Sequence, residues 1–154
     1  MIERYSRKEL KDIWSEENKY KIWLEVEIAA AEAMEKFKII PKGVSSIVKK
    51  KGKIKVKRIH DIEAKVKHDV IAFLTSITEQ AGIKARYLHQ GMTSSDVLDT
   101  SFNIQLMQSG KIILKDIDKI LIVLKRQAKK YKMTPCIGRS HGIHAEPITF
   151  GLKL

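Results

Sequence analysis

Apolar residues recur at intervals of three and four between Ser15 and about Lys38. That spacing is the period of a helix with one buried face, so this segment is predicted to be a long helix. Pro41 predicts its end, because proline lacks an amide donor and disfavours a helical residue before it. A shorter helix is predicted ahead of it, since Ser6 and Glu9 have the spacing of a capping box.

Three further helices are predicted over 44–50, over 56–66 and from Asp69 onward. Asp69 is a suitable N-cap for the last of these, and Gly82 predicts its end. Residues 85–96 show little periodicity and are predicted to form a loop. The first part of the chain is therefore predicted to be a small helical domain.

A much longer helix is predicted from about Ser95 to Lys132. At 1.5 Å per residue it would span about 55 Å, which a small domain cannot cover. We therefore expect it to belong to a helix bundle, with partners from other chains or from further sequence. Its predicted apolar stripe consists of Leu98, Phe102, Leu106, Ile113, Ile117, Ile120, Leu124 and Tyr131.

The last segment of the chain begins where Pro135 breaks the long helix. A polar loop is predicted over 138–147, with Pro147 as the first residue of a new helix. That helix stops at Leu154 without a capping signal, so the chain reads as cut. The predicted fold class is all-α, with an N-terminal helical domain over 1–94 and the beginning of a long-helix bundle over 95–154.

Composition argues against two classes of protein. No run of about 18 uncharged apolar residues is present, so neither a transmembrane helix nor a membrane partner is expected. Cys136 is the single cysteine and cannot form an internal disulfide, and the first residues are charged rather than apolar. Both features favour a cytoplasmic protein over a secreted one.

Basic residues outnumber acidic residues by 30 to 18, for a formal net charge of +12. The densest run is KKKGKIKVKR at 49–58, and clustered cations of this kind can bind phosphates. The run contains no aromatic residue for base stacking and matches no nucleic-acid-binding module. A solvated surface is therefore the favoured interpretation, and no nucleic-acid partner is expected. A stand-alone helical interaction or nucleic-acid-binding module stays the alternative.

Three polar segments contain the residues best suited to chemistry. The first is Lys67-His68-Asp69, where a histidine that can titrate near neutral pH precedes a predicted helix start. From the residues alone, a hydrogen-bonded linker explains His68 more simply. The second is HQGMTSSD at 89–96, in which a glycine followed by hydroxyls at a helix start can bind an anion. Ordinary N-capping uses the same residue types and explains this segment equally well.

The third segment is GRSHGIHAEP at 138–147, whose histidines, arginine, serine and glutamate suit acid–base chemistry. A metal site is the competing interpretation, with His141, His144 and Glu146 as ligands. No other cluster supplies a fourth ligand, so a metal is not expected. A serine hydrolase is disfavoured because no nucleophile elbow is present.

At these same segments the chain resembles the adenylosuccinate lyases, within the fumarase/aspartase superfamily. The resemblance rests on ERYS at 3–6, KHDVIAF at 67–73, HQGMTSSDVLDT at 89–100 and GRSHGIHAEPITFGLK at 138–153. It covers the whole chain in order, as the N-terminal portion of such an enzyme. It implies a homotetramer with a central bundle of long helices and active sites assembled from three subunits. It also implies a cofactor-free β-elimination that releases fumarate from adenylosuccinate, giving AMP, and from the succinyl-carboxamide ribotide, giving the aminoimidazole carboxamide ribotide.

The resemblance implies a role for each matching residue. His141 resembles the general acid that protonates the leaving nitrogen, and His68 resembles its partner at the substrate. Arg4 and Tyr5 resemble a phosphate-binding pair, and His144 is expected to be structural. The other substrate-binding positions that it implies are Lys67, Asp69, His89 beside the phosphate, Thr93 and Ser94 at the succinyl carboxylates, and Ser140.

One element of the adenylosuccinate lyases has no counterpart in these residues. It is the loop Ser-Ser-x-Met-Pro-x-Lys-x-Asn-Pro, which carries the serine assigned as the base. We therefore expect these 154 residues alone to be inactive, because half a site cannot position the reacting groups.

Overall fold

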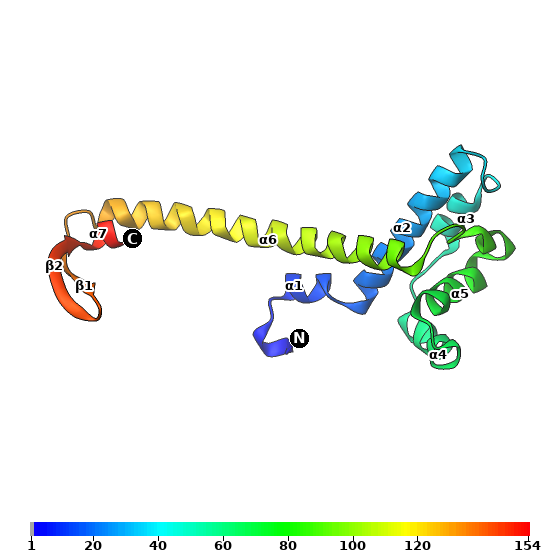
Figure 1. Cartoon of the computed structure of the whole chain (residues 1–154), viewed down its shortest axis with the longest axis horizontal. Helices are drawn as coiled ribbons and strands as arrows, with labels where there is room; N and C mark the ends of the chain where they lie inside the picture. Colours follow the sequence, from blue (N-terminus) through cyan, green and yellow to red (C-terminus); the bar gives the residue numbers. More distant parts are fainter. Residues whose placement is uncertain (1) are drawn as a thin grey trace. The chain divides into compact units, whose positions relative to one another are not determined.

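The structure is a computed structural model that describes residues 2–154, apart from the side chain of Glu3. Helices dominate, and one small two-stranded sheet accompanies them (Figure 1). This architecture confirms the predicted all-α class. The elements in chain order are η1 (Glu3–Tyr5), α1 (Lys8–Ile13), α2 (Glu16–Lys36), α3 (Val44–Lys51), α4 (Val56–Val66), α5 (Asp69–Ala81), η2 (Ile83–Tyr87), α6 (Ser94–Lys130), β1 (Pro135–Ser140), β2 (Ile143–Thr149) and α7 (Phe150–Lys153).

The chain divides into two compact units, the first ending at Ser109 and the second running Gly110–Leu154. The division falls inside α6, which contributes residues to both units. The predicted border between an N-terminal domain ending at residue 94 and a bundle domain starting at residue 95 stays a prediction.

The first unit is built around helices α2, α3, α4 and α5, which gather together in Figure 1. Tyr20, Trp23 and Phe73 form the centre of its core, with ring centroids 5.2 to 5.9 Å apart. Each of the three is at most 1% exposed. Edge-to-face and stacked rings at these distances add to the stabilisation that burial itself provides. The predicted helices of this unit are confirmed, because their apolar faces meet in this core.

Two of the predicted helix starts are wrong. The hydroxyl of Ser6 donates to the carbonyl of Ile2 at 2.8 Å, and the N-cap of α1 is Arg7, which makes no side-chain capping bond. Asp69 is the first residue of α5, and the N-cap is His68, whose Nδ1 accepts from the amide of Ile71 at 3.4 Å. In both cases the helix starts one residue away from the expected cap, because the Ser6 hydroxyl bonds a carbonyl rather than a first-turn amide, and the Asp69 carboxylate accepts from the adjacent amide of Val70.

Within the first unit, α6 buries a different face from the predicted one. Its buried residues are Val97, Ser101, Gln105 and Ser109, at intervals of four. Gln105 Nε2 donates to the carbonyl of Ile13 at 2.8 Å, so this face packs through polar contacts. Phe102 and Leu106, from the predicted stripe, remain about half exposed, at 50% and 45%. Most of the apolar stripe is therefore left exposed by the residues that the structure describes, although Leu98 packs against the core.

The second unit contains a hairpin where a polar loop was predicted. β1 and β2 pair in antiparallel fashion, and Arg139 lies opposite His144. The connecting residues His141 and Gly142 have φ angles of 50° and 77°. Two consecutive positive φ values are what a tight two-residue hairpin turn of type I′ requires. Pro147 accordingly lies in β2 and does not begin a helix, and α7 begins at Phe150.

Gly138 explains how the hairpin tolerates an irregularity. The register shifts between Ile137 and Arg139, as at a β-bulge. A Cβ atom at position 138 would lie 2.8 Å from the carbonyl oxygen of Glu146. Only glycine lets the two strands approach this closely, so this position supports the geometry of the turn that follows.

Candidate active site

The predicted site residues fall into two groups. Arg4, Tyr5, the 67–69 segment, His89, Thr93 and Ser94 belong to the first unit, whereas Ser140 and His141 belong to the second. Among the described residues, no hydrogen bond or ion pair joins one predicted segment to another. The structure therefore gives the local geometry of each segment.

The Lys67–Asp69 segment is the sharp junction between α4 and α5. Lys67 ends α4 in the left-handed conformation with φ 55°, and His68 follows in extended conformation. The Nδ1 atom of His68 lies 3.5 Å from a carboxylate oxygen of Asp69 and accepts the weak capping bond from Ile71. The side chain of His68 is 47% exposed. Its ring is thus fixed on the Nδ1 side while the rest of it stays accessible to a ligand.

His89 is held in place far more tightly than His68. Its Nδ1 atom lies 2.6 Å from Glu27 Oε1, and its backbone amide donates to Glu27 Oε2 at 2.9 Å. Glu27 lies on α2, and its side chain is fully buried. Burial raises the pKa of the Glu27 carboxyl above its ordinary value, and the hydrogen bond from His89 opposes that rise.

Sequence reasoning missed Glu27, although a signal was present. Glu27 lies four residues from Trp23 and four from Ala31, in the middle of the apolar face of α2. A charged residue at a core position is unfavourable for folding, so its presence indicates a function. The interruption of the stripe could therefore have identified Glu27 as a candidate.

Thr93 and Ser94 form the start of α6. The amide of Thr93 donates to Asp96 Oδ2 at 2.9 Å, and the amide of Asp96 donates to the carbonyl of Thr93 at 3.1 Å. These bonds fold the backbone into a cap and use no hydroxyl. The hydroxyls of Thr93 and Ser94 make no hydrogen bond with another described residue, so both are available to a ligand at this helix N-terminus.

Arg4 and Tyr5 lie in η1 and form a stacked pair. The Arg4 guanidinium carbon lies 4.7 Å from the centroid of the Tyr5 ring. Tyr5 is 73% exposed. A guanidinium and a phenol side by side can both donate to a phosphate.

Ser140 and His141 lie at the tip of the hairpin. Both are exposed, and His141 occupies the first central position of the turn in the left-handed conformation. Non-glycine residues held at positive φ cost free energy and concentrate at functional sites. The hairpin thus presents the His141 imidazole without enclosing it.

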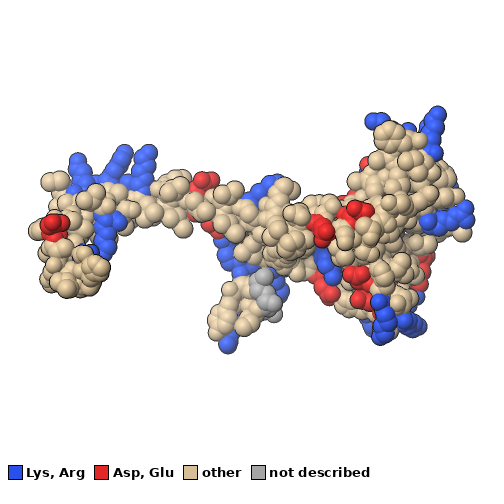
Figure 2. All heavy atoms as spheres, viewed as in Figure 1, with Lys and Arg blue, Asp and Glu red and all other residues tan. Residues whose placement is uncertain are grey.

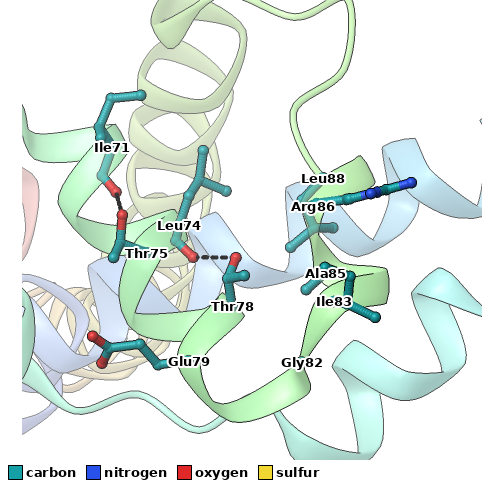
Figure 3. Close-up of a pocket in the computed structure, with 10 residues that line it drawn as sticks. All are labelled: Ile71, Leu74, Thr75, Thr78, Glu79, Gly82, Ile83, Ala85, Arg86 and Leu88. Atoms are coloured by element: carbon teal, nitrogen blue, oxygen red, sulfur yellow. Dashed lines mark hydrogen bonds between the residues drawn. The ribbon is translucent and has the colours of Figure 1, made fainter.

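A shallow apolar groove of about 490 Å³ lies in the first unit (Figure 3). It runs between α5 and η2, from Ile71 to Leu88, the neighbour of His89 in sequence. The hydroxyls of Thr75 and Thr78 in its wall donate to helix carbonyls, at 2.7 and 2.8 Å. They are not free to bind an anion, so this groove is not the predicted site.

The structure describes no metal centre at the hairpin. Within residues 2–154 no group of three or more histidine, cysteine, aspartate or glutamate side chains is arranged to hold a metal ion. His144 is the cross-strand partner of Arg139.

None of the described helices is both long enough and apolar enough to cross a membrane.

The basic run at 49–58 is partly neutralised. Lys49 forms an ion pair with Glu32 on α2, and Arg58 binds Glu79 on α5 with Nε 2.9 Å from the carboxylate oxygen. On the face drawn in Figure 2, basic side chains are spread over several elements rather than gathered in one patch. This distribution favours the interpretation as a solvated surface.

Comparison with known proteins decides the family. A family model with the description "Lyase" matches residues 3–154 of the chain. The chain belongs to this lyase family. It is 48% identical over 154 residues to the adenylosuccinate lyase of Thermotoga maritima and 44% identical over the same length to that of Bacillus subtilis. These matches confirm the predicted resemblance, and the chain spans 36% of the length of these relatives.

Two solved structures share the fold of this chain. A fumarate lyase from Mesorhizobium sp. BNC1 superimposes with a TM-score of 0.90 at 26% identity, over 97% of this chain and 36% of that protein. The β-carboxy-cis,cis-muconate cycloisomerase of Acinetobacter calcoaceticus superimposes with a TM-score of 0.84 at 24% identity, over 96% of this chain and 36% of that protein. The second likeness concerns the fold alone.

Proposed function

We propose that this chain is part of an adenylosuccinate lyase that acts in purine biosynthesis in the cytoplasm. The observation that carries the proposal is the 48% identity to an adenylosuccinate lyase along all 154 residues. The proposed reaction is a β-elimination. It breaks the bond between the purine 6-amino nitrogen and the succinyl carbon, and it releases fumarate and AMP. The succinyl-carboxamide ribotide is the second proposed substrate and gives the aminoimidazole carboxamide ribotide.

Two protons move in this elimination. A base removes one from the carbon beside a succinyl carboxylate, and the electron pair left there forms the double bond of fumarate. We assign His141 as the acid that protonates the departing nitrogen, and His68 as its partner at the substrate. An imidazole suits both roles because its pKa lies near working pH. The exposed position of His141 at a hairpin tip supports this role, since the ring is accessible to a substrate.

Substrate binding is proposed to use the first unit. Arg4 and Tyr5, together with His89, are suited to the phosphate, because each can donate a hydrogen bond to an anionic oxygen. Thr93 and Ser94 are suited to the succinyl carboxylates, because their hydroxyls and the start of α6 favour negative charge. The remaining proposed contacts are Lys67, Asp69 and Ser140. No cofactor is needed for this chemistry.

A homotetramer is the proposed assembly. The apolar stripe of α6 is exposed in this chain, with Ile113, Ile117 and Ile120 between 46% and 57% exposed. An exposed apolar surface of this kind marks an interface. Because the predicted site segments lie in two units, other copies of the chain can contribute the groups that complete each site.

The direct test uses the protein as its complete gene encodes it. Conversion of adenylosuccinate to AMP and fumarate is followed by chromatography. The Ser94→Ala variant tests the assignment of the carboxylate site, since loss of one hydrogen bond to a charged group is expected to raise KM about 10-fold. An unchanged KM would remove Ser94 from that site. Absence of both products with the unmodified protein would overturn the proposed function.

A further inference from the structure

The Glu27 carboxylate lies inside the core of the first unit, and His89 accounts for its hydrogen bonds. One oxygen lies 2.6 Å from Nδ1 of the ring and the other accepts from the backbone amide at 2.9 Å. The Glu27 side chain is 0% exposed, whereas that of His89 is 16% exposed. The pair therefore reaches from the core to the surface, with the carboxylate at the buried end.

Stability alone does not explain a carboxylate at this position. Moving a charge out of water is unfavourable, and an ion pair in the interior recovers that cost only with good geometry. Apolar residues of similar volume often stabilise such positions more. Glu27 has apolar neighbours on its own helix face, Trp23 and Ala31, so an apolar side chain fits the pattern of α2 better.

The geometry defines which ring nitrogen meets a ligand. A carboxylate only accepts hydrogen bonds, so Nδ1 must carry the proton that is shared with Glu27. Nε2 has no hydrogen-bond partner among the described residues and is not one of their enclosed polar atoms. His89 also has φ 63°, a left-handed conformation that the hydrogen bond from its backbone amide to Glu27 helps to hold. Backbone and ring are thus fixed by the same carboxylate.

We propose that Glu27 is a positioning residue that holds His89 with Nδ1 protonated and Nε2 presented to an anionic group of the substrate, the phosphate of the nucleotide. This inference rests on the proposed function. When the ring carries both protons, Nδ1–H donates to Glu27 and Nε2–H donates to a phosphate oxygen. The buried carboxylate then balances the charge of the ring that faces the ligand.

The experiment compares the unmodified protein with Glu27→Gln, each as the complete gene encodes it. A glutamine has one acceptor oxygen in place of two, so it cannot accept from the amide of His89 at one side-chain atom and from Nδ1 at the other. Affinity for AMP and for adenosine, which lacks the phosphate, is measured by titration calorimetry. We expect Glu27→Gln to weaken the binding of AMP about 10- to 100-fold, the range for a hydrogen bond to a charged group. The affinity for adenosine should be unchanged.

Glu35→Gln is the matched control. Glu35 lies on the same helix, and its carboxylate also accepts two backbone amides, from Gly43 at 3.1 Å and Ser45 at 2.7 Å. It has no hydrogen bond to a predicted site residue. A general loosening of α2 would affect both variants, whereas positioning of His89 predicts weaker AMP binding in Glu27→Gln only.

A second measurement is made on the unmodified protein, and a variant serves only to assign its signal. Nitrogen-15 NMR of histidine-labelled unmodified protein, with His89→Asn to assign the signal, reports which ring nitrogen carries the proton. Nδ1 protonated supports the inference, and Nδ1 unprotonated overturns it. Equal AMP affinity in Glu27→Gln and the unmodified protein also overturns it. Failure of the unmodified protein to convert adenylosuccinate defeats the proposed function instead, so the two failures are distinguishable.

Discussion

The two units use the same kinds of residue to different ends. In the first unit, Trp23, Phe73 and Ile77 are at most 1% exposed and enclose one another. In the second unit, Gly110–Leu154, no residue is buried, although Leu114, Leu121 and Ile122 are equally apolar and between 58% and 69% exposed. The contrast shows that apolar content makes a core only where other elements cover it. The first unit supplies its own cover, and the second requires it from elsewhere.

The candidate chemistry follows the same division. His89 in the first unit is fixed by a buried carboxylate, whereas His141 in the second lies on an exposed turn. We infer that one proposed binding group, His89, is positioned from the core of the first unit, and that the proposed acid His141 becomes enclosed only on assembly.

The largest expected effect concerns the hairpin of the second unit. His141→Ala should lower kcat about 100- to 10,000-fold while AMP still binds, because general acid catalysis contributes that range. Steady-state assays and calorimetry measure the two quantities. His144 lies on β2 of the same hairpin, and His144→Ala is the control, which should retain most of its turnover. Normal turnover in His141→Ala would mean that the second unit does not supply the acid.

Truncation of the first unit's core should have the next largest effect. Ile77 is fully buried, so Ile77→Ala should lower the free energy of unfolding by about 2–5 kcal/mol. Urea denaturation measures the change. Ile39, which is 61% exposed in the same unit, provides the control, and Ile39→Ala should stay within about 0.5 kcal/mol of the unmodified protein. Similar values for the two variants would remove the contrast between covered and uncovered positions.

A change to the uncovered stripe of α6 should act on assembly. Ile117→Lys combined with Ile120→Lys places two charges in the proposed interface, and we expect association to weaken about 100-fold or more. Sedimentation velocity over a range of concentrations measures it. Lys115→Ala on the same helix is the control. An unaltered assembly would show that another surface joins the subunits.

The smallest expected effect compares Glu27 with Glu35, two carboxylates of α2 in the first unit. Hydrogen bonds from the backbone of Ser45 and Gly43 hold the pKa of Glu35 below its ordinary value, whereas burial raises the pKa of Glu27. The contribution of Glu35 to stability is therefore present above its unfolded pKa and is lost as pH falls. The contribution of Glu27 to stability depends on pH in the opposite direction: it is present at low pH and is lost as pH rises through the folded pKa of Glu27.

Unfolding free energies from about pH 3 to pH 7 test this pair. Glu35 accepts from amides at the start of α3, so Glu35→Gln should lose about 0.5–2 kcal/mol of unfolding free energy at neutral pH, the range for a helix cap. Its stability should also be less sensitive to acid than that of the unmodified protein. The unmodified protein should lose stability as pH rises from about 4.3, the ordinary carboxyl pKa, because the buried Glu27 ionises. Glu27→Gln should not show this loss. For each variant, the difference in unfolding free energy from the unmodified protein is plotted against pH. If this difference changed in the same direction for both variants, the assigned causes of the two pKa shifts would be wrong.

The sequence by itself determined the helices whose signal is local. α2 and α4 were predicted within two residues of their observed ends, since apolar spacing and the breaker Pro41 act within a few residues. It also determined the family, because the motifs around His68 and His141 are contiguous runs of residues. These predictions needed no contact between distant parts of the chain.

Only the tertiary structure decided the features that depend on distant contacts. The carboxylate of Glu27 meets His89 across 62 residues, and no local pattern encodes that pairing. The face that α6 buries contacts α1 and α2 through polar side chains, because Gln105 donates to the carbonyl of Ile13 and Asn18 donates to Gln108, and its apolar stripe does not predict these contacts. The hairpin around His141 depends on pairing between two weakly patterned strands, whose hydrogen bonds stabilise them only as a pair.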